Sequence, residues 1–250
     1  MIEIEQNWLP LAVLATAMVV VHLFFPILDR LMHARESFWM GLIGGIATGY
    51  VVLYLMPKLA RITVGTIGMD PLAELEFNDL WVYMLLLAGI VSYLVMLHLD
   101  ESLAPSAAMH FDTLAHGAYS FLVGYVFVEM SSDFVEINVA MAVILSLHLL
   151  GMDHLFRHSW PAQFDHKGRW AFALLLLTGA GAGFLTELSK TAINAITAFL
   201  AGVILVNVIS EELPLNHQRR VPFYLLGLAL FMLFAFTVLT VDERMAYPAY

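Results

Sequence analysis

The sequence predicts an all-α membrane protein with eight transmembrane helices. Hydrophobic residues make up 61% of the chain and charged residues only 13%, whereas a soluble domain carries about 25% charged residues. Apolar stretches of roughly 18 residues or more, which are long enough to cross a bilayer as helices, recur along the whole chain. With so few polar side chains the chain cannot cover its own surface, so we expect lipid to be the solvent for much of it.

The eight spans are expected at residues 8–28, 39–57, 80–99, 107–129, 137–157, 170–188, 192–211 and 221–241. The first span is not expected to be a signal peptide, because no basic segment precedes it and no small-residue cleavage site follows it. No separate soluble domain fits between the spans. We therefore expect residues 1–250 to form a single integral membrane domain.

The distribution of Lys and Arg predicts the orientation, because these residues are enriched in the short loops on the inner side of a membrane. With the N-terminus outside, the inside loops hold seven of them and the outside segments four: Arg30, Arg35, Arg157, Lys167, Arg169, Arg219 and Arg220 against Lys58, Arg61, Lys190 and Arg244. Both termini are therefore expected outside a plasma membrane or bacterial inner membrane.

Composition also excludes several kinds of site. The chain has no cysteine, which excludes disulfides and thiolate metal ligands. Its net charge of −10 argues against nucleic-acid binding, which requires clustered Lys and Arg. It contains no Gly-x-x-x-x-Gly-Lys run, so we expect no nucleotide site of that kind.

Two segments repeat one pattern. Residues 45–57 and 202–214 each read glycine, eleven residues, proline, with a polar residue three before the proline. In an eight-helix topology the second and seventh spans run in opposite directions, so the echo predicts an inverted repeat of the kind found in transporters. The alternative is coincidence, since glycine and proline are common in membrane helices. Gly45, Gly49 and Gly202 are expected to let their helices approach neighbours closely.

The fourth and fifth spans hold most of the polar residues. Asp112, His116 and Ser120 are four residues apart and share one face of the fourth span. In the fifth span His148 shares a face with Met152, whereas Asp153, five residues on, is rotated about 140° from His148.

Ionisable residues inside a membrane are costly and usually face a cavity or the bundle interior. The functional interpretation makes His116 and His148 ligands of one metal ion, since imidazole suits zinc, iron, copper and nickel. The alternative is that each histidine bonds a neighbouring helix and only holds it in place. His154 and His158 are interpreted as interfacial, and His22 and His98 are given no role because their helices look peripheral.

These motifs, in this order, resemble the ZIP family of zinc and iron permeases, which has eight helices and both termini outside. Tyr54–Pro57 stands where the family has a His-Leu-Leu-Pro-like motif, and Glu211–Pro214 keeps the Glu and the Pro of the family's Glu-Leu-Leu-Pro. His116 and His148 match the first histidines of the family's fourth-helix and fifth-helix motifs. Asp153 matches the last acidic position of the fifth-helix motif.

The chain also departs from the family's pattern. Gly117 and Ser120 replace an asparagine and a carboxylate on the fourth helix, and Leu149 and Gly151 replace a glutamate and a proline on the fifth. These replacements remove most of the hard oxygen ligands of a two-metal centre, so a one-metal site is what remains chemically reasonable.

The resemblance implies a divalent-metal permease for zinc or iron that works by alternating access without ATP and is not an enzyme. The expected metal-site residues are His116, His148, Met152, Asp153, Ser120 and Glu211. We expect no prosthetic group, and the expected partners are the lipid bilayer, the transported metal ion and, in a homodimer, a second copy of the chain.

Two alternatives remain open. One is a non-transporting membrane protein that keeps a ZIP-like scaffold with a degenerate metal site. The other is a zinc-dependent intramembrane hydrolase, in which His148, Asp153, His154 and His158 would hold zinc and Ser120 would assist, because three histidines and an aspartate can bind zinc and activate water.

Overall fold

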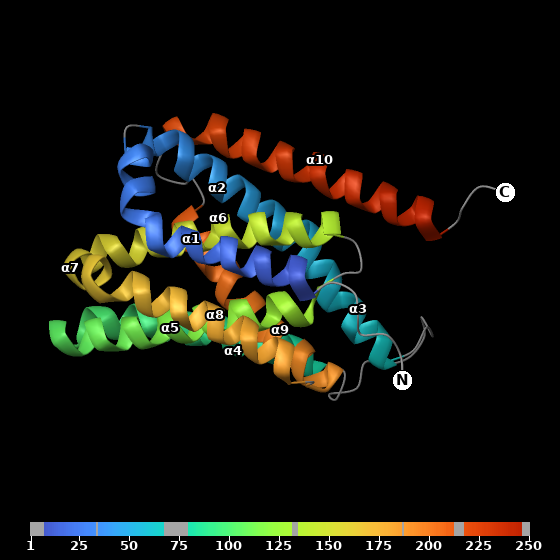
Figure 1. Ribbon diagram of the computed structural model, residues 1–250, viewed down its shortest axis with the longest axis horizontal. Helices are drawn as coiled ribbons and strands as arrows, with labels where there is room; N and C mark the ends of the chain where they lie inside the picture. The colour runs from blue at the N-terminus through green and yellow to red at the C-terminus, as the bar shows by residue number, and fades with distance from the viewer. Residues whose placement is uncertain are drawn as a thin grey trace. The chain divides into compact units, whose positions relative to one another are not determined.

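The computed structural model describes residues 8–33, 35–67, 80–131, 135–186, 188–212 and 218–246 (Figure 1). Every element in these ranges is helical, which confirms the predicted all-α class. In chain order they are α1 (Trp8–His33), α2 (Glu36–Tyr50), η1 (Val51–Leu55), α3 (Met56–Ile67), α4 (Trp81–Ser102), α5 (Pro105–Glu129), α6 (Val135–Ser159), α7 (Pro161–Gln163), η3 (Phe164–Gly168), α8 (Arg169–Leu185), α9 (Lys190–Asn207), η4 (Val208–Glu212), η5 (Gln218–Arg220) and α10 (Val221–Ala246).

Seven helices of the described part are long and apolar enough to cross a membrane, which indicates a membrane protein. They correspond to seven of the eight expected spans, and the remaining one corresponds to α5. This helix has 25 residues and is therefore long enough to cross at about 1.5 Å per residue. Its apolar sequence is interrupted by polar residues such as Asp112 and His116, and it is not among the seven.

The chain folds into two compact units. Unit 1 comprises residues 1–34 and 94–196 and contains α1, α5, α6 and α8. Unit 2 comprises residues 35–93 and 197–250 and contains α2, α3, α10, the first half of α4 and the second half of α9. Each unit thus gathers helices that are far apart in the sequence.

In unit 2, α2 and α10 lie side by side and pack through glycine (Figure 1). A Cβ atom added to Gly45 would lie 2.0 Å from the carbonyl oxygen of Tyr224, and one added to Gly227 would lie 2.2 Å from the carbonyl oxygen of Leu42. Each of these carbonyls belongs to the residue three before the partner's glycine. No side chain fits at such distances, so the two backbones meet directly.

Two further helix pairs repeat this reciprocal glycine contact. In unit 2, α4 meets α9 at Gly89 and Gly202, where an added Cβ would lie 2.1 and 2.0 Å from the partner's carbonyl oxygen. In unit 1, α5 meets α8 at Gly124 and Gly179, with corresponding distances of 2.2 and 2.0 Å. Again each carbonyl lies three residues before the partner's glycine.

The glycines singled out from the sequence therefore behave as predicted. Gly45 and Gly202 lie at backbone contacts, and a Cβ on Gly49 would lie 2.8 Å from ring atoms of Phe231. The prediction of close approach at these three positions is confirmed.

The two segments that echo each other in sequence share a second feature. Residues 51–55 and residues 208–212 are both π-helical. Each π-helix begins six residues after its motif glycine, Gly45 or Gly202, and ends two residues before the motif proline. A π-helix inserts an extra residue into a turn and is often found at functional positions. Equal placement in both segments strengthens the sequence echo.

Candidate metal site

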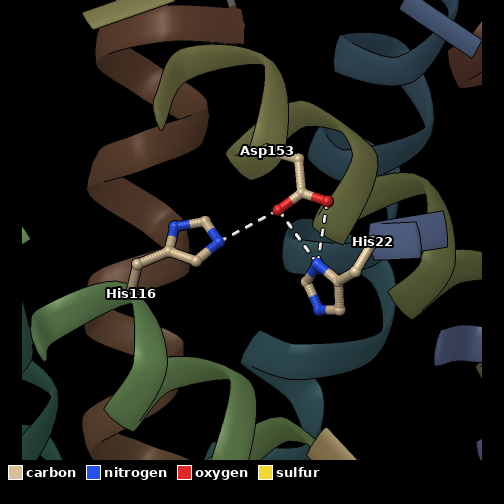
Figure 2. A group of neighbouring side chains, drawn as sticks. All are labelled: His22, His116 and Asp153. Carbon is tan, nitrogen blue, oxygen red and sulfur yellow. Dashed lines mark hydrogen bonds and ion pairs between the residues drawn. The ribbon is translucent and has the colours of Figure 1, made fainter. Parts of the chain in front are cut away.

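Three buried side chains from three helices meet inside unit 1 (Figure 2). His22 of α1 places Nδ1 at 2.8 Å from Oδ2 and 3.0 Å from Oδ1 of Asp153 in α6. His116 of α5 places Nε2 at 3.1 Å from the same Oδ1. The carboxylate of Asp153 thus accepts N–H groups from both rings and links the three helices.

Burial makes this arrangement costly unless it is fully paired. The exposed fractions are 0% for His22 and Asp153 and 5% for His116. A carboxylate with no water around it needs hydrogen-bond donors or cations, and here two imidazoles provide the donors. The group therefore has the features expected of a functional ionisable site within apolar helices.

The elements around the group explain its position. A Cβ on Gly117 would lie 2.8 Å from a methyl carbon of Leu175, so the glycine lets α8 lie close beside α5 at this level. This brings the Phe172 ring of α8 to 4.2 Å from the His116 ring, centroid to centroid. The Ser120 hydroxyl donates a hydrogen bond to the His116 carbonyl at 2.9 Å and so follows the helix backbone.

The geometry suits a single metal ion. One ligand atom from each of the three residues can be chosen so that all lie within 4.8 Å of one another. Ligands of one zinc ion lie about 2.0–2.1 Å from it, so a small contraction of the group would bring all three into range. Two imidazoles and one carboxylate are a ligand set used for zinc and for iron(II), with positions left open for water or an entering ligand.

The ring of His22 has a second nitrogen that takes no part in these contacts. The second ring nitrogen of His22, Nε2, is buried and has no hydrogen-bond partner among the described residues. Either nitrogen of an imidazole ring can coordinate a metal. Nδ1 of His22 can therefore bind an ion when the ring proton is on Nε2.

The expected site residues divide into those the structure gathers and those it does not. His116 and Asp153 are together as ligand candidates, whereas His148 is not part of the group. The His148 ring lies 5.8 Å from the Tyr119 ring, and Met152 is buried in the core. Ser120 bonds the backbone, as described above. Glu211 lies in η4, and its side chain is outside the described part of the chain.

His22 is the residue that the sequence interpretation left without a role. It occupies the middle of an apolar helix, with Met18 and Phe25 buried on the same side. The cost of an ionisable group in that setting is itself the signal that could have identified it. A single histidine forms no polar stripe like those of the fourth and fifth spans, so helical periodicity alone does not predict it as a ligand.

Comparisons with known proteins do not place the chain in a family. No family model matches it, and a search of curated proteins finds no significant match.

Proposed function

We propose that this protein is a divalent-metal permease that carries one zinc or iron(II) ion at a time at His22, His116 and Asp153. The observation that carries the proposal is the buried group itself, in which two imidazoles and a carboxylate from three helices converge within one unit. Two neutral imidazoles and one carboxylate reduce the charge of a divalent ion to one, which lowers the cost of holding it away from water.

Burial supports alternating access as the mode of transport. Because the three side chains are at most 5% exposed, an ion can reach them only after unit 1 changes its internal contacts. The ion would then be released after a second change that opens the other side. The sequence has no P-loop, so the proposed permease moves the ion down its own electrochemical gradient or in exchange with another ion.

The scaffold also favours a transporter. The pairs α2–α10 and α9–α4 use the same reciprocal glycine contact, and η1 and η4 lie at the same offset from Gly45 and Gly202. We interpret these matched features as the inverted repeat expected from the sequence, an organisation that many secondary transporters share. The resemblance to the ZIP family at His116 and Asp153 points the same way.

A second function is favoured by one observation. The three side chains are already joined by hydrogen bonds, so they could hold α1, α5 and α6 together in a protein that transports nothing. The hydrolase is less favoured, because His148 contacts Tyr119 and His154 bonds Asp29. Neither histidine is in the group with Asp153.

The permease is tested with purified protein in detergent and in liposomes. We expect one equivalent of Zn²⁺ or Co²⁺ to bind by calorimetry, and Zn²⁺ entry into liposomes that contain a zinc-sensitive dye. Asp153→Asn and His116→Gln should each reduce affinity at least tenfold, because the loss of one ligand leaves an incomplete coordination shell. His98→Gln on α4 is the matched control and should behave as wild type.

The outcomes separate the two functions. Binding of one metal ion with no entry into liposomes would support a non-transporting metal protein. Absence of any divalent-metal binding by the wild type would contradict the permease and support the second function, in which the three side chains only hold α1, α5 and α6 together. Equal binding by Asp153→Asn would contradict both the site and the permease.

A further inference from the structure

On one side of the metal site, α1 and α6 carry the same order of residue types. Along α1, Phe25 and Asp29 follow His22 on the same helix face, three and seven residues on. Along α6, Phe156 and Arg157 follow Asp153 by three and four residues. Both helices therefore run from a metal-site residue to a phenylalanine and then to a charged residue.

The phenylalanines of α1 and α6 belong to a layer of four aromatic rings. Phe25 and Phe164 have ring centroids 5.4 Å apart, and Phe156 and Phe172 have centroids 5.1 Å apart. Phe164 joins the two pairs at 6.1 Å from Phe156 and 6.2 Å from Phe172. The exposed fraction is 6% for Phe156 and 0% for the other three. We call these four residues the phenylalanine layer.

The layer closes directly on the metal site. The His116 ring lies 4.2 Å from the Phe172 ring and 5.2 Å from the Phe156 ring, and the His22 ring lies 6.1 Å from Phe172. Close-packed aromatic side chains leave no passage for a hydrated ion and offer it no ligand. An ion at the site is therefore sealed on this side as long as the layer is packed.

The charged residues that follow the phenylalanines make a set of contacts around Arg157. Its Nε and Nη2 donate to the two carboxylate oxygens of Asp165 in η3 at 2.8 and 3.0 Å, and its Nη1 donates to Asp29 of α1. His154 adds a contact from Nδ1 to Asp29 at 3.0 Å. We call Asp29, Arg157 and Asp165 the charged latch, which ties α1, α6 and η3 together.

The latch holds the layer through the elements it joins. Asp165 follows Phe164 directly in the π-helix η3, so the forked contact from Arg157 fixes the segment that carries one of the four rings. On α1, Pro26 follows Phe25 and has no N–H to bond the His22 carbonyl, and the helix is visibly bent (Figure 1). Two irregular segments thus lie where a movement would open the layer.

The latch is more exposed than the layer. The exposed fractions are 14% for Asp29, 25% for Arg157 and 38% for Asp165. Partly exposed ion pairs can exchange partners, whereas fully buried pairs are costly to break. The contacts around Arg157 can therefore be remade during a transport cycle.

We propose that the phenylalanine layer and the charged latch form a closed gate on this side of the metal site, which opens when Arg157 releases Asp165 and Asp29. The proposal rests on the proposed function for its role in transport. Arg157 is proposed to keep this side of the site sealed whether or not a metal is bound.

The gate is tested by thiol accessibility, since the chain contains no cysteine of its own. Ser120→Cys introduces a nearly isosteric thiol at a buried position one turn from His116. Its rate of modification by a small cationic thiosulfonate is measured in purified, metal-free protein. Adding Arg157→Gln should raise the rate of modification about tenfold. The removal of charge-assisted hydrogen bonds destabilises the closed state by about that factor.

Two further variants make the result specific. Arg157→Lys keeps the charge but not the fork, so it should raise the rate less than Arg157→Gln. Arg220→Gln removes a comparable ion pair to Glu36, 2.8 Å long, in unit 2, and should leave the rate unchanged. If Arg157→Gln lowers the thermal midpoint enough to prevent the measurement, Asp165→Asn takes its place, because it removes the forked contact and keeps the one to Asp29.

The outcomes are distinct from those of the permease test. An unchanged rate in Arg157→Gln or its replacement, or an equal rise in Arg220→Gln, would overturn the gate even if metal binds at the site. A specific rise with no metal binding by the wild type would support the gate and reject the permease.

Discussion

At the scale of single residues, Asp153 is the group on which the site depends. It is fully buried, and its two oxygens accept the hydrogen bonds that join the three side chains. Loss of either histidine would leave a buried carboxylate with fewer donors, which typically costs about 1–3 kcal/mol. A bound divalent ion would replace those donors with a much stronger partner. The wild-type protein should therefore be more stable with metal than without it.

Stabilisation by metal distinguishes two candidate ligands: His22, which lies beside Asp153 in the structure, and His148, which the sequence favoured. At a metal concentration 100 times the dissociation constant, a bound ion should stabilise the protein by about 2.7 kcal/mol. We expect Zn²⁺ to raise the thermal midpoint of the wild type and of His148→Gln, and to have little effect on His22→Gln. The midpoints are measured with and without Zn²⁺ by scanning fluorimetry. The opposite ranking of the two variants would restore His148 as the ligand.

Part of the site could be predicted from sequence, and the reason is geometric. His116 belongs to a polar stripe with period four, and Asp153 is a carboxylate in an apolar helix. The sequence pattern therefore indicates both as site residues. The rotation of about 140° between His148 and Asp153 meant that only one of them could face His116, and helical periodicity alone does not decide which. His22 is a long-range partner, 131 positions from Asp153, and its pairing depends on tertiary packing.

At the scale of elements, the glycine contacts set how closely the helices pair. Helix association in a membrane depends on van der Waals packing and on small residues that let backbones approach. The same reciprocal contact holds α2 to α10, α4 to α9 and α5 to α8. The sequence predicted the close approach and the echo between residues 45–57 and 202–214. It did not predict the π-helices, because one inserted residue leaves no mark on an apolar pattern.

Two glycines of α8 allow a matched test of this packing. A Cβ on Gly179 would lie 2.0 Å from the Phe121 carbonyl oxygen, whereas a Cβ on Gly181 would meet no atom within 4 Å. Gly179→Ala should destabilise the protein by about 1–3 kcal/mol, because the added methyl displaces the backbone of α5. Gly181→Ala should be neutral or stabilising by up to about 1 kcal/mol through helix propensity. Equilibrium unfolding in detergent measures both, and equal effects would refute the contact.

At the scale of the whole molecule, the direction of paired helices bears on the number of crossings. Along the contact between α4 and α9 the residue numbers rise together, from Leu86 beside Gly202 to Tyr93, whose hydroxyl donates to Asn207 at 2.9 Å. The two helices are therefore parallel. Parallel helices that both cross a membrane must be separated by an odd number of crossings. The helices between them are α5, α6 and α8, so the parity requires α5 to cross with the other two.

This reasoning predicts the side on which each end of α5 lies. Single cysteines at Leu103, before α5, and at Ser131, after it, are placed in the chain, which has no cysteine of its own. A third, at Ser189 after α8, is the control, because α6 and α8 together return the chain to the side of Ser131. With both termini outside, a membrane-impermeant maleimide should label Ser131→Cys and Ser189→Cys in intact cells, and Leu103→Cys only after lysis. If Leu103→Cys and Ser131→Cys were labelled from the same side, α5 would not cross. The candidate metal site would then lie against a helix that enters the membrane without spanning it.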